Sequence, residues 1–338
     1  GPRTRVLPAV PTGIKVAPLG AARESAAVVA LAGGDDAIGL LKDVNSASLD
    51  RTITLSGSGT TSVQSFKVSD SDGDNIDDLL VIDAGDLAAV TPSVWYLPGS
   101  SNDFGLPLEV RLAESVPTPL AGFAITDAAL GDIDGDRFAD LVVGTALAGT
   151  SFPGEVRILW GVPGGFDSSA TILDANVHAT GVEVSDLDID GDIDIVLLDG
   201  PRNRLAVIEN LRVQGGALRT EILAQAEFTA VMDSPAKMEL LDLNHDYLPE
   251  VALLGAPKRA FFDNSKAFST LTDISVLYNV GARAFMAPAQ ATMLGAVADL
   301  QFGDVNGDGI TDLLATSTDV PRATAVFMGQ EPVGFELS

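Results

Sequence analysis

The chain has 338 residues, of which 46% are hydrophobic, with a formal net charge of −27 at pH 7 and no cysteine. This length permits a large buried core, either in one repeat protein or in two ordinary domains. The charge argues against nucleic acid and anionic membrane surfaces as partners, and the lack of cysteine excludes a disulfide framework and thiolate metal sites.

The start of the chain predicts four short strands and no acidic loop. Residues 1–12 are expected to form a leader, in which residues 3–10 supply a strand to the last repeat. The sequence begins Gly1-Pro2 without Met, which resembles the remnant of a protease site, so we expect a targeting segment or further domains to have been removed. No run of 18 apolar residues occurs, so no segment is predicted to span a membrane. The predicted strands are residues 13–17, 26–31, 37–41 and 52–55.

Five copies of an acidic loop follow, and each runs directly into an apolar strand. Oxygen-bearing side chains occupy positions 1, 3, 5 and 9 of every copy. Four such groups in nine residues would repel one another strongly, so we infer that a hard cation lies among them and predict up to five Ca²⁺ sites. The residues are Asp70, Asp72, Asp74 and Asp78; Asp132, Asp134, Asp136 and Asp140; Asp186, Asp188, Asp190 and Asp194; Asp242, Asn244, Asp246 and Glu250; and Asp304, Asn306, Asp308 and Asp312.

Each loop is predicted to join two strands rather than two helices. A helix-flanked calcium hand needs a bidentate Glu at position 12, whereas position 12 here holds residues typical of buried strands, and apolar residues alternate ahead of each loop. Two alternatives are a solvated turn, because Asp and Gly favour turns, and a magnesium site, although Mg²⁺ prefers few protein ligands. The residues at position 12 are Val81, Val143, Leu197, Leu253 and Ala315.

The loops recur every 54 to 62 residues, and further strand-like segments follow them. This period fits four strands with their turns, and such units repeated radially are typical of a β-propeller. The predicted fold is therefore an all-β, single β-propeller over residues 13–338, with six four-stranded blades, or seven as the alternative, and calcium loops in five. The predicted blades are residues 13–62, 63–120, 121–178, 179–229, 230–293 and 294–338.

The third and fifth loops, residues 186–194 and 304–312, resemble the FG-GAP and VCBS-type repeats of integrin alpha-subunit propellers and of bacterial surface proteins. The resemblance covers blades two to six and implies a calcium-binding propeller in which the backbone carbonyl at position 7 is a further ligand. The fourth copy departs from the pattern at Asn244, His245, Pro249 and Glu250, so we expect its site to be the weakest or the most distorted. The carbonyl donors implied are Ile76, Phe138, Asp192, Leu248 and Ile310.

Little in the sequence indicates catalysis. The two histidines, His178 and His245, lie in different repeats without an obvious Ser or Cys partner motif, which argues against a nucleophilic triad. The loops hold 18 of the 47 Asp and Glu residues at ligand positions, and their interpretation as calcium ligands argues against a glycosidase pair. Trp95 and Trp160 occupy matching third-strand positions, where we expect them to pack between blades; the alternative is a sugar-stacking platform.

Basic residues are predicted on the face opposite the calcium hairpins. They lie between the second and third strands of blades four to six, and the blade-five loop, about residues 257–272, is the longest. Guanidinium groups suit bidentate contact with anions, so we predict that this face recruits an anionic protein or glycan; the alternative is that these side chains only solubilise turns. The predicted partner-binding residues are Arg202, Arg204, Lys258, Arg259 and Arg322.

The predicted function is that of a calcium-stabilised β-propeller acting as a non-enzymatic recognition or adhesion module. Open calcium loops usually need the high calcium of an extracellular or periplasmic space, so we expect an extracellular, cell-surface or periplasmic location. Two alternatives are a carbohydrate-binding lectin and a polysaccharide lyase or hydrolase.

Overall fold

The computed structural model is built from β-strands in nearly all of the residues that it describes. Among these residues the only helical element is the 3₁₀ turn Gly200–Arg202, and none forms a helix long and apolar enough to cross a membrane. The chain divides into two compact units, Gly1–Asn176 and Val177–Ser338. The described residues are 10–19, 24–32, 36–41, 51–55, 63–71, 74–83, 93–100, 103–110, 123–147, 154–173, 176–211, 227–261, 268–286, 289–303, 310–317, 324–330 and 334–337.

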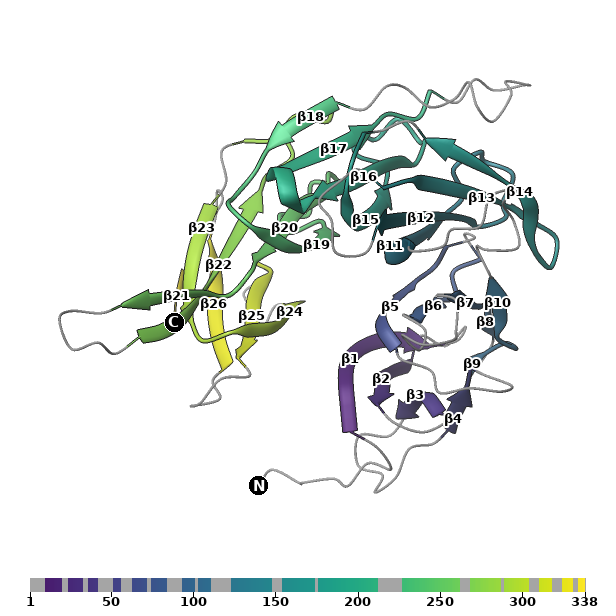
Figure 1. Ribbon diagram of the computed structural model, residues 1–338, viewed down its shortest axis with the longest axis horizontal. Helices are drawn as coiled ribbons and strands as arrows, with labels where there is room; N and C mark the ends of the chain where they lie inside the picture. Colours follow the sequence, from purple (N-terminus) through teal and green to yellow (C-terminus); the bar gives the residue numbers. More distant parts are fainter. Residues whose placement is uncertain are drawn as a thin grey trace. The chain divides into compact units, whose positions relative to one another are not determined.

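The first unit contains three antiparallel four-stranded sheets, which follow one another along the chain (Figure 1). Since β1 begins at Val10, residues 10–12 of the predicted leader belong to the first sheet, whereas residues 1–9 lie outside the described part. The sheets are β1 (Val10–Leu19), β2 (Glu24–Ala32), β3 (Asp36–Leu41) and β4 (Arg51–Thr54); β5 (Val63–Ser69), β6 (Asp78–Asp83), β7 (Ser93–Leu97) and β10 (Leu108–Val110), with the hairpin β8 (Gly99–Ser100) and β9 (Asp103–Phe104); and β11 (Phe123–Gly131), β12 (Asp140–Leu147), β13 (Val156–Val162) and β14 (Gly165–Leu173).

The second unit repeats this plan with one sheet of five strands between two sheets of four. Each sheet again begins with the hairpin that carries, or is predicted to carry, an acidic loop. The sheets are β15 (Ala179–Ser185), β16 (Asp194–Asp199), β17 (Arg204–Ile208) and β18 (Glu227–Ala230); β19 (Pro235–Leu241), β20 (Glu250–Gly255), β21 (Lys258–Phe261), β22 (Phe268–Leu277) and β23 (Ala289–Leu294); and β24 (Val297–Gly303), β25 (Asp312–Ser317), β26 (Thr324–Gln330) and β27 (Gly334–Leu337).

One predicted loop is wrong. Residues 257–272 were expected to form an open connection, but β21 pairs with the first part of β22, from Lys258 opposite Leu271 to Phe261 opposite Phe268. Phe and Thr in these segments favour strand geometry. This hairpin extends from the central sheet of the second unit.

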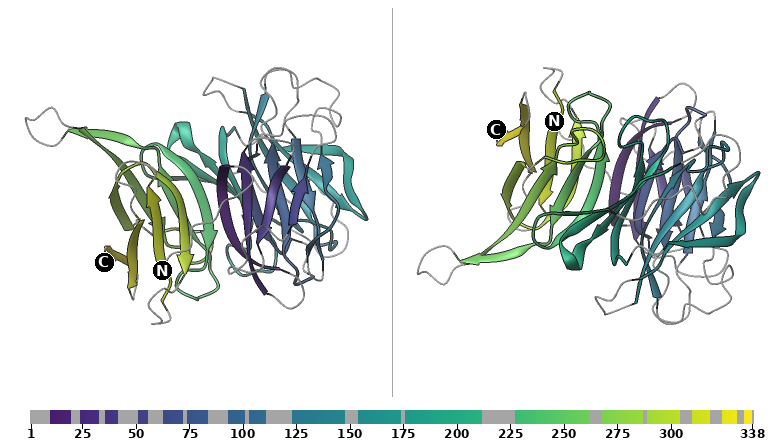
Figure 2. Two further views of the ribbon diagram at one scale, coloured as in Figure 1. Left: turned by 90° about the horizontal axis from the view of Figure 1, so that it is seen from below. Right: turned by 90° about the horizontal axis from the view of Figure 1, so that it is seen from above.

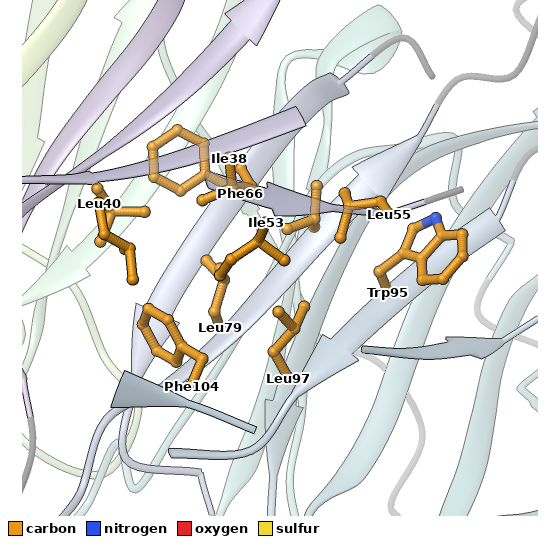
Figure 3. Close-up of a cluster of buried hydrophobic side chains, with 11 residues drawn as sticks. Ile38, Leu40, Ile53, Leu55, Phe66, Leu79, Trp95, Leu97 and Phe104 are labelled. Carbon is orange, nitrogen blue, oxygen red and sulfur yellow. The ribbon is translucent and has the colours of Figure 1, made fainter. Parts of the chain in front are cut away.

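The apolar runs β6 and β20 are buried on both faces, because each lies in a sheet that packs between two others. All six residues of β6 are buried. Leu79 and Val81 pack in a core shared with the first sheet, whereas Leu80 and Ile82 pack in a core shared with the third. Figure 3 shows side chains of the first of these cores converging from β3, β4, β6 and β7. Figure 2 shows the sheets of this unit, purple to teal, stacked beside one another.

The second unit is packed in the same way. Val251 and Leu253 of β20 share a core with β16 and β17, whereas Leu254 packs on the opposite face, in a core shared with β24, β25 and β26. Successive four-stranded sheets whose central strands are buried on both sides are typical of propeller blades. The fold is therefore all-β and of the β-propeller type, and closure into a ring of six or seven blades stays a prediction.

Candidate metal centres

The last acidic residue of each described loop begins the following strand and is buried. Asp140 at the start of β12 is 0% exposed. Its Oδ2 accepts hydrogen bonds from the backbone N–H groups of Ile133 (2.8 Å) and Asp134 (3.3 Å), and its Oδ1 accepts one from Gly161 (2.7 Å) in β13. The carboxylate therefore ties the acidic loop to the third strand of its own sheet.

The contact with the loop recurs in three other copies, and in two of them a residue that follows the third strand also donates. Asp78 accepts from the N–H groups of Ser71 (3.2 Å) and Gly99 (2.6 Å). The donors to Asp194 are Leu187 (3.3 Å) and Asn210 (2.8 Å), and Glu250 accepts from Leu243 (2.7 Å). A Cβ at Gly161 would lie 2.5 Å from the carbonyl oxygen of Ala139, so glycine allows this donor to approach closely.

The loop backbone has one conformation in all the copies whose residues are described. The carboxylate at position 1 accepts a hydrogen bond from the N–H of position 6, as in Asp132 with Arg137 (2.9 Å) and Asp242 with Tyr247 (3.0 Å). Positions 4 and 6 have positive φ, which few residues other than glycine adopt readily. Left-handed Ile189 (φ 62°) and Tyr247 (φ 71°) show that the side-chain hydrogen bonds hold the turn even where glycine is absent.

Two loops bring three carboxylates to one point. Oxygen atoms of Asp132, Asp134 and Asp136 lie within 4.8 Å of one another, as do oxygen atoms of Asp186, Asp188 and Asp190. Oxygen ligands bind Ca²⁺ at about 2.3–2.6 Å, so two ligands on opposite sides of an ion are separated by about 5 Å. Both triplets are therefore compact enough to hold a metal ion.

Buried oxygen atoms without hydrogen-bond partners occur in the same loops. They are Oδ1 of Asp132, Oδ1 of Asp188 and Oε1 of Glu250. A buried carboxylate oxygen without a donor is costly unless a cation compensates it. The residues present therefore fit a divalent cation.

Burial also raises the pKa values of three of these last acidic residues above their ordinary range. Burial raises the pKa of Asp140 to about 7; the N–H of Gly161 opposes the increase and the charge of Asp134 adds to it. Burial likewise raises the pKa of Glu250 to about 7 and that of Asp194 to about 6. A nearby cation would favour the ionised forms.

The five predicted loops are described to different extents. The second, third and fourth are complete, whereas Asp72 of the first and Asp304, Asn306 and Asp308 of the fifth lie outside the described residues. In the fifth loop, Asp312 is 0% exposed and begins β25.

The fourth loop keeps the shared hydrogen bonds, and its Asn244 side chain both donates to Asp246 Oδ2 and accepts from the Asp246 N–H (both 3.0 Å). Its backbone therefore forms the same turn as the other copies, and the expectation that its site is the weakest or the most distorted stays a prediction.

The sequence pattern missed residues outside the loops that contact one of them. Asn279 donates to the carbonyl of Leu187 (2.7 Å), and Arg283 forms ion pairs with Asp188 and with Glu209 (2.9 Å). Asn279 and Arg283 follow β22, in the next sheet along the chain. No local spacing links them to residues 186–194, so the sequence held no signal for this contact.

Three of the five predicted partner-binding cations pair with acidic side chains of this chain, namely Arg202, Arg204 and Lys258. Arg202 and Arg204 both donate to Oδ2 of Asp199 (2.9 Å each), and Asp199 is 0% exposed. Arg204 also stacks on the ring of Phe228, 3.8 Å from its centroid. Lys258 pairs with Asp273. Arg259 is exposed, and Arg322 lies outside the described residues.

The aromatic and histidine residues considered for other functions are placed as follows. Trp95 is 8% exposed and lies in the core between the first two sheets, and Trp160 is 3% exposed, with its Nε1 donating to Thr171 (2.8 Å). Packing between blades is thus confirmed for Trp95, and Trp160 is buried. His245 is an exposed residue of the fourth loop, and His178 is buried just before β15.

The fold and these loops define a class: an all-β protein of the propeller type, with acidic hairpin loops that are able to hold metal ions. Comparison with known proteins adds no narrower assignment. No protein-family model matches the chain, and no curated protein matches it.

Proposed function

We propose that the chain is a calcium-binding β-propeller of six blades, with up to five calcium loops, that serves as a non-enzymatic recognition or adhesion module in an extracellular, cell-surface or periplasmic setting. One observation carries the calcium assignment: two triplets of aspartates are gathered within 4.8 Å, and each includes a buried oxygen without a hydrogen-bond partner, in Asp132 and Asp188. The resemblance to FG-GAP repeats agrees with it.

The residues proposed to hold the ion are the acidic side chains of each loop, together with the carbonyl at position 7. In the Asp132 loop (residues 132–140), these are Asp132, Asp134, Asp136, the carbonyl of Phe138, and Asp140. A bound ion would supply the positive charge that offsets the clustered carboxylates. Asp140 already holds the loop against β13, so the proposed role of the ion is to stabilise the hairpin rather than to activate a substrate.

The recognition role rests on the scaffold and on one surface cluster. Loops on rigid scaffolds commonly carry binding residues. Arg202 and Arg204 both donate to Asp199, so two guanidinium groups are held beside one another at this point. Arg204 lies over Phe228, which is 46% exposed. This arrangement supports an anionic protein or glycan as the partner.

Calcium binding is tested by titration calorimetry and thermal melting of wild type and of Asp134→Asn and Asp188→Asn. Each variant should bind one calcium ion fewer than wild type. Glu227→Gln is a matched control, because Glu227 is exposed in β18 and this change removes one charge outside the loops. No calcium binding by wild type, or an identical melt with and without chelator, would overturn the proposal.

Recognition is tested separately by binding of the calcium-loaded protein to arrays of sulfated and carboxylated glycans, neutral glycans and acidic peptides. We expect signal on the anionic probes, reduced in Lys258→Ser/Arg259→Ser. Selective binding to neutral sugars would favour the lectin alternative, and depolymerisation of uronic-acid polymers would favour the enzyme. Binding to anionic probes alone, at the same level in Lys258→Ser/Arg259→Ser as in wild type, would refute the proposed surface.

A further inference from the structure

A compact turn after β22 lies against the acidic loop of the preceding sheet. The turn comprises residues 279–286 and closes on itself through hydrogen bonds from the Val280 N–H to the Ala284 carbonyl (2.9 Å) and from the Met286 N–H to the Tyr278 carbonyl (2.8 Å). Phe285 packs against the core between the fourth and fifth sheets. The turn is therefore anchored at its base.

Two side chains of this turn reach the Asp186 loop (residues 186–194). Asn279 is 3% exposed; its Nδ2 donates to the carbonyl of Leu187 (2.7 Å), and its Oδ1 accepts from the N–H of Gly281 (3.0 Å). Arg283 donates through Nη1 to Oδ2 of Asp188 and through Nη2 to Oε1 of Glu209 (2.9 Å). The Arg283 and Asp188 side chains are 17% and 16% exposed, so both are mostly shielded from water.

The two oxygens of Asp188 have different environments. Oδ2 is held by the guanidinium of Arg283, whereas Oδ1 is buried without a hydrogen-bond partner. Asp188 is also the middle member of the Asp186, Asp188 and Asp190 triplet. Arg283 thus fixes one oxygen and leaves the other for a cation.

We propose that Arg283, supported by Asn279, is a positioning residue for the calcium site of the Asp186 loop. This inference rests on the proposed calcium function and assigns to it two residues from the next sheet. Groups that orient metal ligands typically change metal affinity by about 10–100-fold when they are removed. Calcium bound at the Asp186 loop should in turn order residues 279–286, because an ion that fixes Asp188 also fixes the partner of Arg283.

Charge repulsion between Arg283 and the ion opposes this positioning effect. Glu209 partly neutralises the guanidinium at 2.9 Å. The loop also contains Asp186, Asp190 and Asp194 besides Asp188, so a negative excess remains after Arg283 is paired. Positioning therefore outweighs repulsion, and removal of Arg283 should weaken calcium binding.

The test is hydrogen exchange of the full chain at increasing calcium concentration, because it reports each loop separately. In wild type, peptides covering residues 186–194 and 279–286 should gain protection at the same calcium midpoint. Arg283→Gln should raise the midpoint of residues 186–194 by about 10–100-fold and leave that of residues 132–140 unchanged. Arg283→Lys keeps the charge but not the planar fork, so it should restore part of the affinity.

The matched control is Lys67→Gln, which also breaks an ion pair between shielded side chains, with Asp127, but lies outside the loops. It should leave both midpoints unchanged. An unchanged or lower midpoint for residues 186–194 in Arg283→Gln overturns the positioning role. If Arg283→Gln lacks wild-type protection in β16 and β20, the sheet itself is disturbed and the midpoint of residues 186–194 in Arg283→Lys is used instead. An unchanged or lower midpoint in Arg283→Lys then overturns the positioning role. Absence of calcium-dependent protection at residues 132–140 in wild type would count against the proposed function instead.

Discussion

Removing both arginines beside Asp199 should destabilise the second unit far more than the two single changes together. Asp199 is 0% exposed and both arginines donate to its Oδ2, while its Oδ1 is buried without a partner. Either arginine alone still pairs the carboxylate. Without both, a buried charge remains with neither of its ion-pair partners, which costs about 3–5 kcal/mol.

The single changes should be milder, and unequal. Arg202→Ser removes a side chain that is 34% exposed, so we expect a loss of about 1 kcal/mol or less. Arg204→Ser also removes the stacking on Phe228, so a loss of about 1–2 kcal/mol is expected. The double variant should therefore show a coupling energy beyond the sum of the single losses.

Urea unfolding of the two single variants, the double variant and the double variant with Asp199→Asn measures this coupling. Asp199→Asn removes the buried charge, so it should recover a large part of the stability lost in the double variant. Additive losses for the two arginines, or no recovery with Asp199→Asn, would refute the reasoning. The result also affects tests of recognition, because serine at both positions would lower stability as well as partner binding.

Three further predictions concern the loops. Chelator should lower the thermal midpoint. Calcium at 100-fold excess over its dissociation constant contributes about 2.7 kcal/mol per site, and 1 kcal/mol corresponds to about 2–4 °C in a unit of this size. A shift of the midpoint below 2 °C would contradict this prediction. Gly161→Ala should weaken calcium binding by the Asp132 loop, measured by exchange of residues 132–140, because a Cβ would lie 2.5 Å from the Ala139 carbonyl and displace the donor to Asp140. Gly165→Ala, whose Cβ would meet only the end of the Leu108 side chain at 3.2 Å, tests for a general effect of added methyl groups in this hairpin. In chelator, the free energy of unfolding should fall as pH rises from 4 to 7. The pKa of Asp140 is raised from 3.8 to about 7 in the folded protein, so the stability contributed by its protonated form is complete below pH 3.8 and is lost as the pH approaches 7. A thermal midpoint that rises with pH over this range would exclude this prediction.

The acidic loops could be predicted from sequence because their determinants are local. In the Asp132 loop, position 1 accepts a hydrogen bond from position 6 and position 5 accepts one from position 7, so the spacing itself encodes the turn. The two-sided burial of the following strands was also predictable, because β6 and β20 are continuous apolar runs. Sequence reasoning identified Asp140 only as a ligand, whereas its hydrogen bond to Gly161 gives it a second role in joining strands.

Contacts between sheets could not be predicted in the same way. Arg283 and Asp188 are separated by 95 residues, and their pairing depends on how the turn after β22 packs on the neighbouring sheet. Arg202 and Arg204, by contrast, lie only three and five residues after Asp199 in the sequence. Their pairing with Asp199 was missed because the basic residues were considered as a surface patch, without asking which buried acid at the end of β16 needed a partner.

The two roles of Asp140 explain how a cation could stabilise the fold without contacting the core. Its carboxylate accepts hydrogen bonds from the loop and from β13, so any group that favours its ionised form strengthens both connections. Burial acts in the opposite direction, since it raises the pKa of Asp140 to about 7. An ion in the Asp132 loop would oppose that shift and keep the acceptor charged. Calcium would then stabilise the pairing of whole strands, which is the property that a rigid recognition scaffold requires.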